Sequence, residues 1–150
     1  MLKIGKFVNT HGIKGEIRIK SDFSRKDLIF KKGNYIYINN KKFLIKSYRV
    51  HKNYDMLTFD GINNINEILP FKGNLVYIDP NDIHEFIIED LIKYNIKIKN
   101  DIYSVKEVLK NNGKILIRLS SNKLVPYEDV FIVNKDEESK TITMNYPIDI

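Results

Sequence analysis

A glycine loop near the start of the chain carries the side chains best suited to chemistry or to binding. It reads His-Gly-Ile-Lys-Gly over residues 11–15, and Arg18 follows in the next alternating run. The imidazole of His11, close in sequence to Lys14 and Arg18, could stack on a base or bond a phosphate. It could instead pin the loop by accepting a hydrogen bond from a backbone N–H. Both interpretations of His11 stay open, and the structural one is preferred.

The other reactive residue types do not form the pattern of an enzyme's reaction centre. His11, His51 and His84 lie far apart, with no second ligand at the spacing of a zinc site. The sequence has no Cys, and no Gly-x-Ser-x-Gly turn offers an activated serine. The glycine loop also lacks the Gly-x4-Gly-Lys-Ser/Thr spacing of a nucleotide-hydrolysing loop. We therefore expect a protein that is not an enzyme, with no catalytic residue, metal or cofactor.

Positive charge is concentrated in the first half of the chain. Residues 1–80 hold 15 Lys or Arg and 7 Asp or Glu, a net charge of +8, whereas residues 81–150 hold 10 and 12, a net charge of −2. Attraction to nucleic-acid phosphates is the commonest cause of such a gradient, and a solvated basic face is the alternative. Most of the aromatic residues between these cations are expected in the core; the four are Phe7, Phe23, Phe30 and Tyr35. The candidate RNA-binding residues are His11, Lys14, Arg18, Lys20, Arg25 and Lys26, and Lys31 and Lys32 extend the same basic surface.

Composition indicates a soluble protein that folds. Hydrophobic residues make up 43% of the chain and charged residues 29%, as in ordinary globular domains. The absence of Cys suits a reducing cytoplasm. No apolar run approaches the roughly 18 residues that span a bilayer, and Met1 precedes a charged alternation rather than an apolar leader. We expect a cytoplasmic location.

Alternating residues on both sides of the glycine loop predict the two strands that hold it. Ile4–Val8 and Glu16–Lys20 put β-branched residues on one face and charges on the other. Gly12 and Gly15 allow the positive φ or the close backbone approach that such a loop needs. The loop side chains are therefore expected in a fixed pose.

The rest of the first half predicts a small closed barrel, because closure removes the exposed edges of so short a sheet. A helical turn is expected at Lys26–Phe30, a hairpin turn at Asn39-Asn40, and a short helix at Ile62–Leu69 that Pro70 ends. Four more strands complete the six: Tyr35–Ile38, Phe43–Val50, Met56–Phe59 and Leu75–Ile78.

A second β unit is expected after a linker. Asp79-Pro80-Asn81-Asp82 combines turn-forming side chains with a proline, and the charge changes sign there. We predict domains at residues 1–79 and 86–150, joined by residues 80–85. A turn is expected at Asn111-Asn112-Gly113. The predicted strands are Ile96–Ile98, Tyr103–Leu109, Ile115–Leu119, Val130–Val133 and Thr141–Met144.

Six residues of the opening segment match, at fixed spacing, the first hairpin of a known protein family. They are Gly5, His11, Gly12, Gly15, Glu16 and Arg18. The pattern of Gly, then His-Gly-x-x-Gly-Glu, then a basic alternating strand resembles the start of the RimM family of bacterial ribosome maturation factors. A run of this length is more specific than an isolated glycine pair.

The second half resembles the same family. Phe86-Ile87 precedes Asp90-Leu91-Ile92, where the family has an aromatic pair, usually two tyrosines, before Asp-Leu-Ile-Gly. Leu124-Val125-Pro126-Tyr127 stands where the family has Leu-Ile-Pro, so the resemblance covers nearly the whole chain. Phe86 keeps a ring without the hydroxyl, Ile87 keeps only apolar bulk, and Lys93 replaces a glycine. Core packing of Phe86 and Ile87 is an equal alternative to partner contact.

The resemblance implies an all-β fold of two small barrels. The first would be a six-stranded barrel like that of reductase and elongation-factor families, and the second a PRC-type barrel. It further implies a non-enzymatic ribosome assembly factor that binds the head of the immature small ribosomal subunit and assists 16S rRNA folding and processing. The implied partner is small-subunit ribosomal protein nineteen, bound through Phe86, Ile87, Asp90 and Leu91. The charge gradient assigns rRNA phosphates to the first barrel. We expect a monomer that does not bind membranes.

Two rival functions remain open. The first barrel could belong to an RNA-modifying or flavin-type enzyme, which a bound chromophore or nucleotide would reveal. The second barrel could belong to a membrane-associated scaffold, because PRC barrels also occur in membrane-associated proteins. Binding to anionic vesicles would reveal this function.

Overall fold

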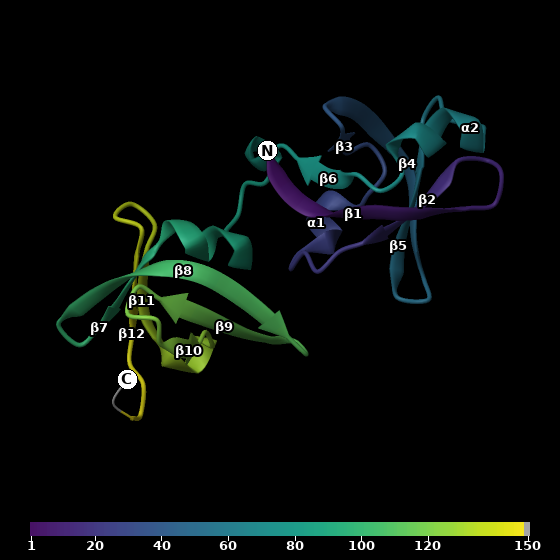
Figure 1. Ribbon diagram of the computed structural model, residues 1–150. Coiled ribbons are helices and arrows are strands. Elements are labelled where there is room, and N and C mark those ends of the chain that lie inside the picture. The colour runs from purple at the N-terminus through teal and green to yellow at the C-terminus, as the bar shows by residue number, and fades with distance from the viewer. Residues whose placement is uncertain (149–150) are drawn as a thin grey trace. The chain divides into compact units, whose positions relative to one another are not determined.

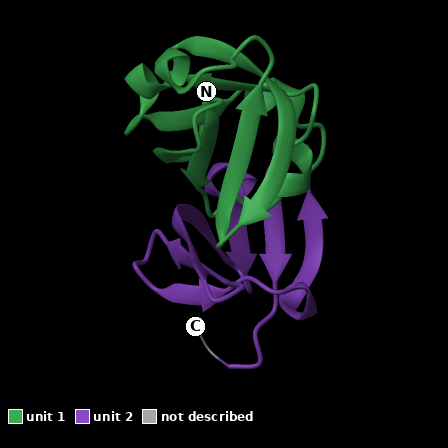
Figure 2. Ribbon diagram, turned by 90° about the vertical axis from the view of Figure 1, so that its right-hand side faces the viewer, with its two compact units in different colours: residues 1–85 green, residues 86–150 purple. Residues whose placement is uncertain are grey.

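The computed structural model describes residues 1–148 and divides the chain into two compact units, Met1–Glu85 and Phe86–Ile150 (Figures 1 and 2). Both units consist mainly of strands. Residues 80–85, predicted as a linker, are counted with the first unit, and Pro80–Asp82 form a short 3-10 helix there.

The first unit is a closed barrel of six antiparallel strands, in the order β1-β2-β5-β4-β3-β6 (Figure 1). The predicted six-stranded barrel is therefore confirmed. Its strands are β1 (Leu2–His11), β2 (Glu16–Lys20), β3 (Tyr35–Ile38), β4 (Lys41–His51), β5 (Tyr54–Phe59) and β6 (Leu75–Ile78).

The core of the barrel is formed mainly by alternate residues of these strands, because successive side chains of a strand point to opposite faces. In β5 the consecutive residues Met56 and Leu57 are both buried. Each buried Ile, Leu or Phe stabilises the fold by about 1.5–3 kcal/mol relative to an exposed one. The strand residues of this core are Ile4, Phe7, Ile17, Ile19, Ile36, Ile38, Phe43, Ile45, Met56, Leu57, Phe59, Val76 and Ile78.

Strands β1 and β2 lie close together at Gly5. A Cβ atom on Gly5 would lie 2.6 Å from the carbonyl oxygen of Lys20 and 2.9 Å from Cγ2 of Ile19. The pairing of β1 with β6 also shifts register between Lys3 and Gly5. A side chain at this position would therefore push β1 away from β2.

Two short helices cover parts of the first unit: α1 (Lys26–Ile29) and α2 (Ile65–Ile68). The predicted helix over 62–69 is shorter than expected, and it begins after Asn64, whose side chain accepts from the N–H of Asn66 at 2.8 Å. Pro70 does not end it. The proline lies inside a following 3-10 helix, Leu69–Phe71, near its start, where its missing N–H is not needed.

Two hairpin turns of the barrel have positive φ at both central residues, as type I′ turns require. Asn39 and Asn40, with φ of 50° and 63°, form the predicted turn between β3 and β4. Lys52 and Asn53, with φ of 50° and 65°, form a turn between β4 and β5 that the sequence analysis did not predict.

The second unit is a six-stranded sheet in the order β10-β9-β8-β7-β12-β11 (Figure 1). Strands β7 and β12 run parallel, and the other neighbours are antiparallel. A 3-10 helix, Ile88–Lys93, precedes the sheet. The strands are β7 (Asn95–Ile98), β8 (Asp101–Asn111), β9 (Lys114–Leu119), β10 (Leu124–Pro126), β11 (Ile132–Asp136) and β12 (Thr141–Met144).

The two end strands of this sheet, β10 and β11, are not paired with each other within residues 86–148. The hydroxyl of Tyr146 donates to the carbonyl of Pro126 at 2.7 Å, which ties the segment after β12 to β10. The sheet encloses a separate apolar core. Its members are Leu91, Tyr94, Ile96, Ile98, Val105, Ile117, Leu119, Val125, Tyr127, Ile142, Met144 and Tyr146.

Two details of the second unit differ from the sequence-based expectation. Val130 does not lie in a strand: it belongs to a 3-10 helix, Asp129–Phe131, and is 79% exposed. Strand β10 was not predicted, because a run of three residues that ends in proline has a weak strand pattern.

Candidate nucleic-acid interface

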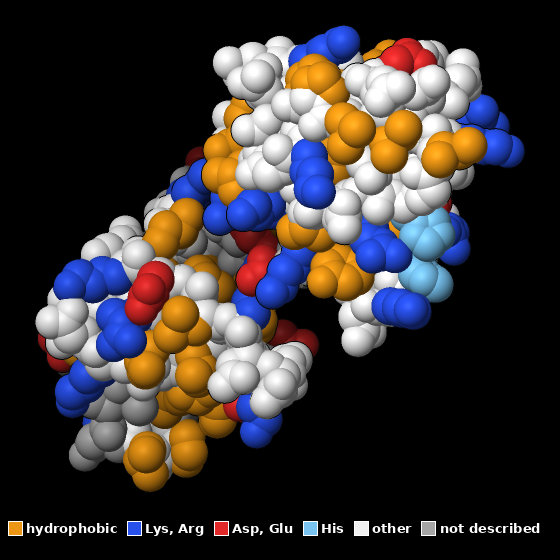
Figure 3. Space-filling view, turned by 45° about the vertical axis from the view of Figure 1, so that its right-hand side comes forward, with side chains coloured by type: hydrophobic (Ala, Val, Ile, Leu, Met, Phe, Trp, Pro, Cys, Tyr) orange, Lys and Arg blue, Asp and Glu red, His pale blue; other side chains and the backbone are white. Residues whose placement is uncertain are grey.

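The glycine loop lies beside the hairpin of β4 and β5. His11 pairs with Glu16 across the loop, and His51 pairs with Tyr54 across the next hairpin turn. Because β2 pairs with β5, the two hairpins are neighbours in the barrel. The rings of His11 and His51 have centroids 5.4 Å apart. Figure 3 shows two adjacent imidazoles next to Lys and Arg side chains on the first unit.

Arg18 is held between the two hairpins. Its Nη2 lies 2.9 Å from Nδ1 of His11, and a guanidinium can only donate, so Nδ1 accepts. The guanidinium carbon lies 6.0 Å from the ring centre of Tyr54, at the limit of a cation–π contact. The Nε of Arg18 is buried and has no hydrogen-bond partner among the described residues. His11 therefore orients Arg18 instead of accepting from a backbone N–H.

Glu16 is fixed by a two-pronged ion pair with Arg49 of β4. The Nη2 and Nε of Arg49 lie 2.7 and 2.9 Å from the two carboxylate oxygens. This hydrogen bonding lowers the pKa of Glu16, assisted by the charges of Arg49, His11 and His51 and opposed by burial. We call the five residues the hairpin cluster: His11, Glu16, Arg18, Arg49 and His51.

His51 experiences the positive field of this cluster. Its pKa is lowered, first by loss of solvation and then by the charges of Arg49, His11, Lys52 and Arg18. The cluster therefore resists a further proton, and a bound anion would relieve that repulsion.

The loop that carries Lys14 is held by contacts with residues 62–65. Gly15 has φ of +98°, and a Cβ atom there would lie 2.8 Å from Cγ2 of Ile62. The carbonyl of Ile13 accepts from the N–H of Ile65 at 2.9 Å, which ties the loop to the start of α2. Lys14 itself is exposed. The structure thus brings three predicted residues, His11, Lys14 and Arg18, to one hairpin.

Lys20, Arg25 and Lys26 lie elsewhere in the first unit. Lys20 is exposed at the end of β2, opposite Lys6 of β1. Arg25 bonds to Asp27 and lies 2.9 Å from a carboxylate oxygen of Glu85.

The ammonium of Lys26 contacts a buried carboxylate of the same unit. Its Nζ lies 2.9 Å from Oδ2 of Asp55, whose side chain is only 2% exposed. Arg25 and Lys26 therefore belong to ion pairs within the unit, and the structure does not bring them to the hairpin cluster.

The aromatic residues between the cations of the first half lie mostly in the core. Phe7, Phe23 and Phe30 are at most 4% exposed, whereas Tyr35 is 39% exposed. Most of the four are thus core residues, as predicted, and Tyr35 occupies an outward position of β3, whose inward positions are Ile36 and Ile38.

The predicted partner-binding residues of the second unit are mostly buried. Ile87 is 3% exposed and Leu91 is fully buried, while Asp90 accepts from the N–H of Ile87 at 3.1 Å. Phe86 is half-buried: its ring meets Tyr94 edge-on, 5.4 Å between centroids, and Nζ of Lys135 lies 3.7 Å from the centre of the Phe86 ring. Among the four predicted partner-binding residues, Phe86 is therefore the one whose aromatic ring is accessible in part to a partner.

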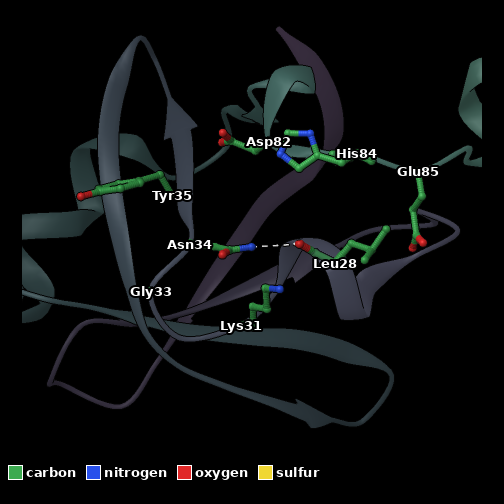
Figure 4. A pocket seen from close by; sticks show the side chains of 9 residues that line it. Leu28, Lys31, Gly33, Asn34, Tyr35, Asp82, His84 and Glu85 are labelled. Atoms are coloured by element: carbon green, nitrogen blue, oxygen red, sulfur yellow. Dashed lines mark hydrogen bonds between the residues drawn. The ribbon is translucent and has the colours of Figure 1, made fainter.

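A hollow of about 490 Å³ lies beside α1, lined in part by residues 82–85 (Figure 4). Asn34 donates to the carbonyl of Leu28 at 2.9 Å on its wall. Figure 4 shows Asp82, His84 and Glu85 pointing in different directions, so they do not converge on one point.

The described part of the chain offers neither a metal site nor a spanning helix. Residues 1–148 contain no group of three or more His, Asp or Glu side chains placed to hold a metal ion. None of the helices in that range has the length and apolar character to cross a membrane.

Sequence reasoning missed Arg49 and His51 as members of the interface. Their link to His11 and Glu16 arises only from the pairing of β2 with β5 and of β5 with β4. The usable signal was the Lys52-Asn53 pair, which a turn prediction would have placed between two strands.

Taken together, the chain is a two-unit β protein whose candidate site is a basic, ring-bearing outer surface rather than an enclosed pocket. A family model described as the RimM N-terminal domain matches residues 2–83. The protein belongs to the RimM family. Ribosome maturation factor RimM from Bacillus thuringiensis (strain Al Hakam) and from Bacillus cereus (strain AH187) are each 33% identical to it over 159 residues, covering 95% of this chain and 93% of theirs.

Two solved structures are also similar to this chain. A 16S ribosomal RNA processing protein RimM from Pseudomonas aeruginosa has a TM-score of 0.49 at 14% identity, covering 97% of this chain and 96% of its own. The N-terminal domain of RimM from Thermus thermophilus has a TM-score of 0.48 at 16% identity, covering 56% of this chain and 94% of its own.

Proposed function

We propose that this protein is a non-enzymatic ribosome maturation factor that binds the head of immature small ribosomal subunits in the cytoplasm and assists the folding and processing of 16S rRNA. Family membership supports the general role, because the curated relatives bear the name ribosome maturation factor. The hairpin cluster of the first unit supports contact with rRNA.

The observation that carries the proposal is the braced, cationic tip of the β1–β2 hairpin. Arg18 is partly exposed and is oriented by His11, and Lys14 stands in solvent on a fixed loop. Residues 1–85 hold 15 basic and 9 acidic side chains, whereas residues 86–150 hold 10 of each. A basic surface of this kind attracts phosphates and positions a protein on RNA without bond chemistry.

Such a factor acts by differential binding. It must bind the immature subunit more tightly than the mature one, because only a difference in affinity can shift the folding equilibrium of rRNA. Release then follows when mature contacts replace the surface that the factor holds.

The second unit is assigned to a protein partner, small-subunit ribosomal protein nineteen. Phe86 supplies a half-buried ring, Ile87 and Leu91 are buried, and Asp90 caps the short helix Ile88–Lys93 by accepting from the N–H of Ile87. Aromatic side chains in such semi-buried positions dominate many protein interfaces.

The proposal is tested by sedimenting the full chain with immature and mature small subunits over a range of salt. Preference for immature subunits is expected, with affinity falling about a thousandfold between roughly 50 and 200 mM salt if about six phosphates are contacted. Lys14→Glu and the double variant Lys14→Glu/Arg18→Glu should weaken binding. Lys97→Glu/Lys114→Glu, two exposed lysines of the second unit, is the control with the same charge change.

Thermal unfolding of each variant separates binding from folding. Equal affinity for mature and immature subunits would contradict the proposal. Binding to anionic vesicles but not to subunits would support the scaffold alternative, and a copurifying flavin or nucleotide would support the enzyme alternative.

A further inference from the structure

Two tyrosines flanked by two lysines form a row across four neighbouring strands of the barrel. Lys3 of β1 pairs with Tyr77 of β6, Tyr77 pairs with Tyr37 of β3, and Tyr37 pairs with Lys42 of β4. Directly paired residues share a face, and adjacent strands lie about 4.8 Å apart. We call this set the tyrosine row.

The tyrosine row lies on the outside of the barrel. Its strand neighbours Ile36, Ile38 and Val76 are fully buried, so the alternating positions point outward. Tyr37 and Tyr77 are half-exposed. These rings are therefore not needed to fill the core.

A hollow of about 520 Å³ lies over the tyrosine row. Tyr37 and Tyr77 line it together with the amide side chains of three asparagines, and each amide can both donate and accept a hydrogen bond. None of the lining residues carries a carboxylate. The other residues of its lining are Met1, Asn39, Asn40, Asn74 and Leu75.

The strands on this side of the barrel carry basic but no acidic side chains. The contiguous strands β4, β3, β6 and β1 contain no Asp or Glu, whereas β2 and β5 each contain one. Nζ of Lys42 lies 3.9 Å from the ring centre of Tyr35, which keeps a cation beside the aromatic surface. Figure 3 shows basic and hydrophobic side chains intermingled on the first unit. The basic residues of the four strands are Lys3, Lys6, Lys41, Lys42, Lys46 and Arg49.

We propose that the tyrosine row binds single-stranded RNA. Unpaired bases stack on Tyr37 and Tyr77, the asparagine amides meet the base edges, and Lys3 and Lys42 meet the flanking phosphates. Aromatic rings inside a cationic groove are the usual means of holding unpaired nucleotides, and a duplex would hide the base faces that stacking needs. The inference rests on the proposed function and deepens it, since it names unpaired rRNA segments as the substrate class.

The test measures fluorescence anisotropy of an unstructured RNA of about eight nucleotides, alone and annealed into a duplex, with the full chain. Tighter binding of the single strand is expected. Tyr37→Ala and Tyr77→Ala should each weaken it by roughly 5- to 150-fold, the effect of losing one stacked base. Tyr37→Phe and Tyr77→Phe keep the ring and should bind within about twofold of the unaltered chain.

The lysines are tested in the same assay. Lys3→Ala/Lys42→Ala should flatten the dependence of affinity on salt by a slope of about 1.4, because two single-strand phosphate contacts are lost. Lys97→Ala/Lys114→Ala in the second unit should leave it unchanged. Thermal unfolding reports whether each variant is folded.

A second measurement does not depend on the variants. Photo-crosslinking of the unaltered chain to thiouridine-substituted RNA should place the adducts on Tyr37 or Tyr77. Adducts confined to other strands, equal binding of duplex and single strand, or unchanged affinity of the alanine variants would each overturn the inference.

Sedimentation with immature subunits separates this inference from the proposed function. One outcome is that the double variant Tyr37→Ala/Tyr77→Ala still binds subunits while the unaltered chain binds no RNA oligonucleotide. That result overturns the inference but not the proposed function. A second outcome also overturns the inference. If the double variant loses subunit binding and the unaltered chain crosslinks to no RNA, the tyrosine row binds a protein partner. Crosslinking at the row without any subunit binding supports the inference and contradicts the proposed function.

Discussion

Lys26 and Asp55 show that a cation within a basic segment can have a structural task. Among the described residues, Asp55 is the charged side chain that lies buried, at 2% exposed. It accepts from the hydroxyl of Tyr48 at 2.6 Å and pairs with the ammonium of Lys26 at 2.9 Å. Burial, followed by this hydrogen bond, raises the pKa of Tyr48 well above its usual range. A buried carboxylate needs these partners, because an unpaired charge in the interior is costly.

Replacing Lys26 by alanine is expected to destabilise the first unit. The Lys26→Ala variant leaves Asp55 with one neutral donor, and because the lysine is partly exposed the loss should be about 1–3 kcal/mol. Urea unfolding of Lys26→Ala measures it, and Lys31→Ala, an exposed neighbour, should change stability by less than about 0.5 kcal/mol. Unchanged stability combined with weaker RNA binding would instead make Lys26 an RNA contact.

RNA bound at the hairpin cluster is expected to make the affinity depend on pH. The pKa of His51 is lowered in the free protein, and a bound phosphate would raise it. A proton is then taken up on binding, so affinity should rise as the pH falls from about 8 to about 6.

Sedimentation with immature small subunits, repeated across that pH range, tests this coupling. His51→Ala should flatten the dependence, whereas His84→Ala, an exposed imidazole outside the cluster, should keep it. An identical pH dependence in His51→Ala would show that the phosphate does not reach the cluster.

At the scale of residues, the sequence predicted the features that depend on neighbouring residues. It did not predict contacts between residues far apart in the sequence. The loop that carries His11 and Lys14 could be recognised from its glycines. The distant carboxylate partners of Arg25 and Lys26 could not, because Glu85 and Asp55 lie far away in the sequence and meet them only in the folded unit.

At the scale of elements, hairpin geometry decides where the functional side chains stand. The β1–β2 hairpin is tied to α2 through the carbonyl of Ile13, and Gly15 packs against Ile62. The hairpin tip is therefore rigid where it carries Lys14, which reduces the entropy lost when a phosphate binds.

The two loop glycines are expected to respond differently to alanine. Gly15→Ala combines a φ of +98° with a Cβ only 2.8 Å from Ile62 Cγ2, and should cost about 2–4 kcal/mol. Gly12→Ala, with φ of +72° and open space around the Cβ, should cost about 1–2 kcal/mol. Urea unfolding of both variants compares them, and equal losses would show that the contact with Ile62 yields freely.

Turns were the elements that the sequence predicted best, for a physical reason. Asparagine tolerates the left-handed conformation, so Asn39-Asn40 and Asn112-Gly113 were recognisable, and both have positive φ. Lys52 adopts the same conformation without such a preference, and the turn at Lys52-Asn53 was missed. Its φ of 50° is imposed by the pairing of β4 with β5.

At the scale of the whole molecule, the chain divides into two compact parts, Met1–Glu85 and Phe86–Ile150. Residues 80–85 support the first part, since Glu85 pairs with Arg25 and lies with Asp82 around the hollow beside α1. We propose that they form the last segment of the first domain while still serving as the connection to the second.

Truncation tests that boundary. Residues 1–85 expressed alone are expected to unfold cooperatively, because the barrel closes on its own core. Residues 1–79 should also fold but be less stable by up to about 1 kcal/mol, the contribution of an exposed ion pair. Urea unfolding of both fragments checks this, and the absence of a cooperative transition for 1–85 would show that the first unit depends on the second.

The unpaired end strands of the second unit bear on how the protein behaves when it is concentrated. An unpaired strand offers its backbone to other chains, and such ends commonly seed aggregation. Strand β10 is only three residues long and ends in Pro126, which lacks an N–H, while β11 carries Lys135 and Asp136 in exposed positions. Both ends are thus poor templates for strand addition. We therefore expect the sheet of the second unit not to join the sheets of other molecules when the protein is concentrated.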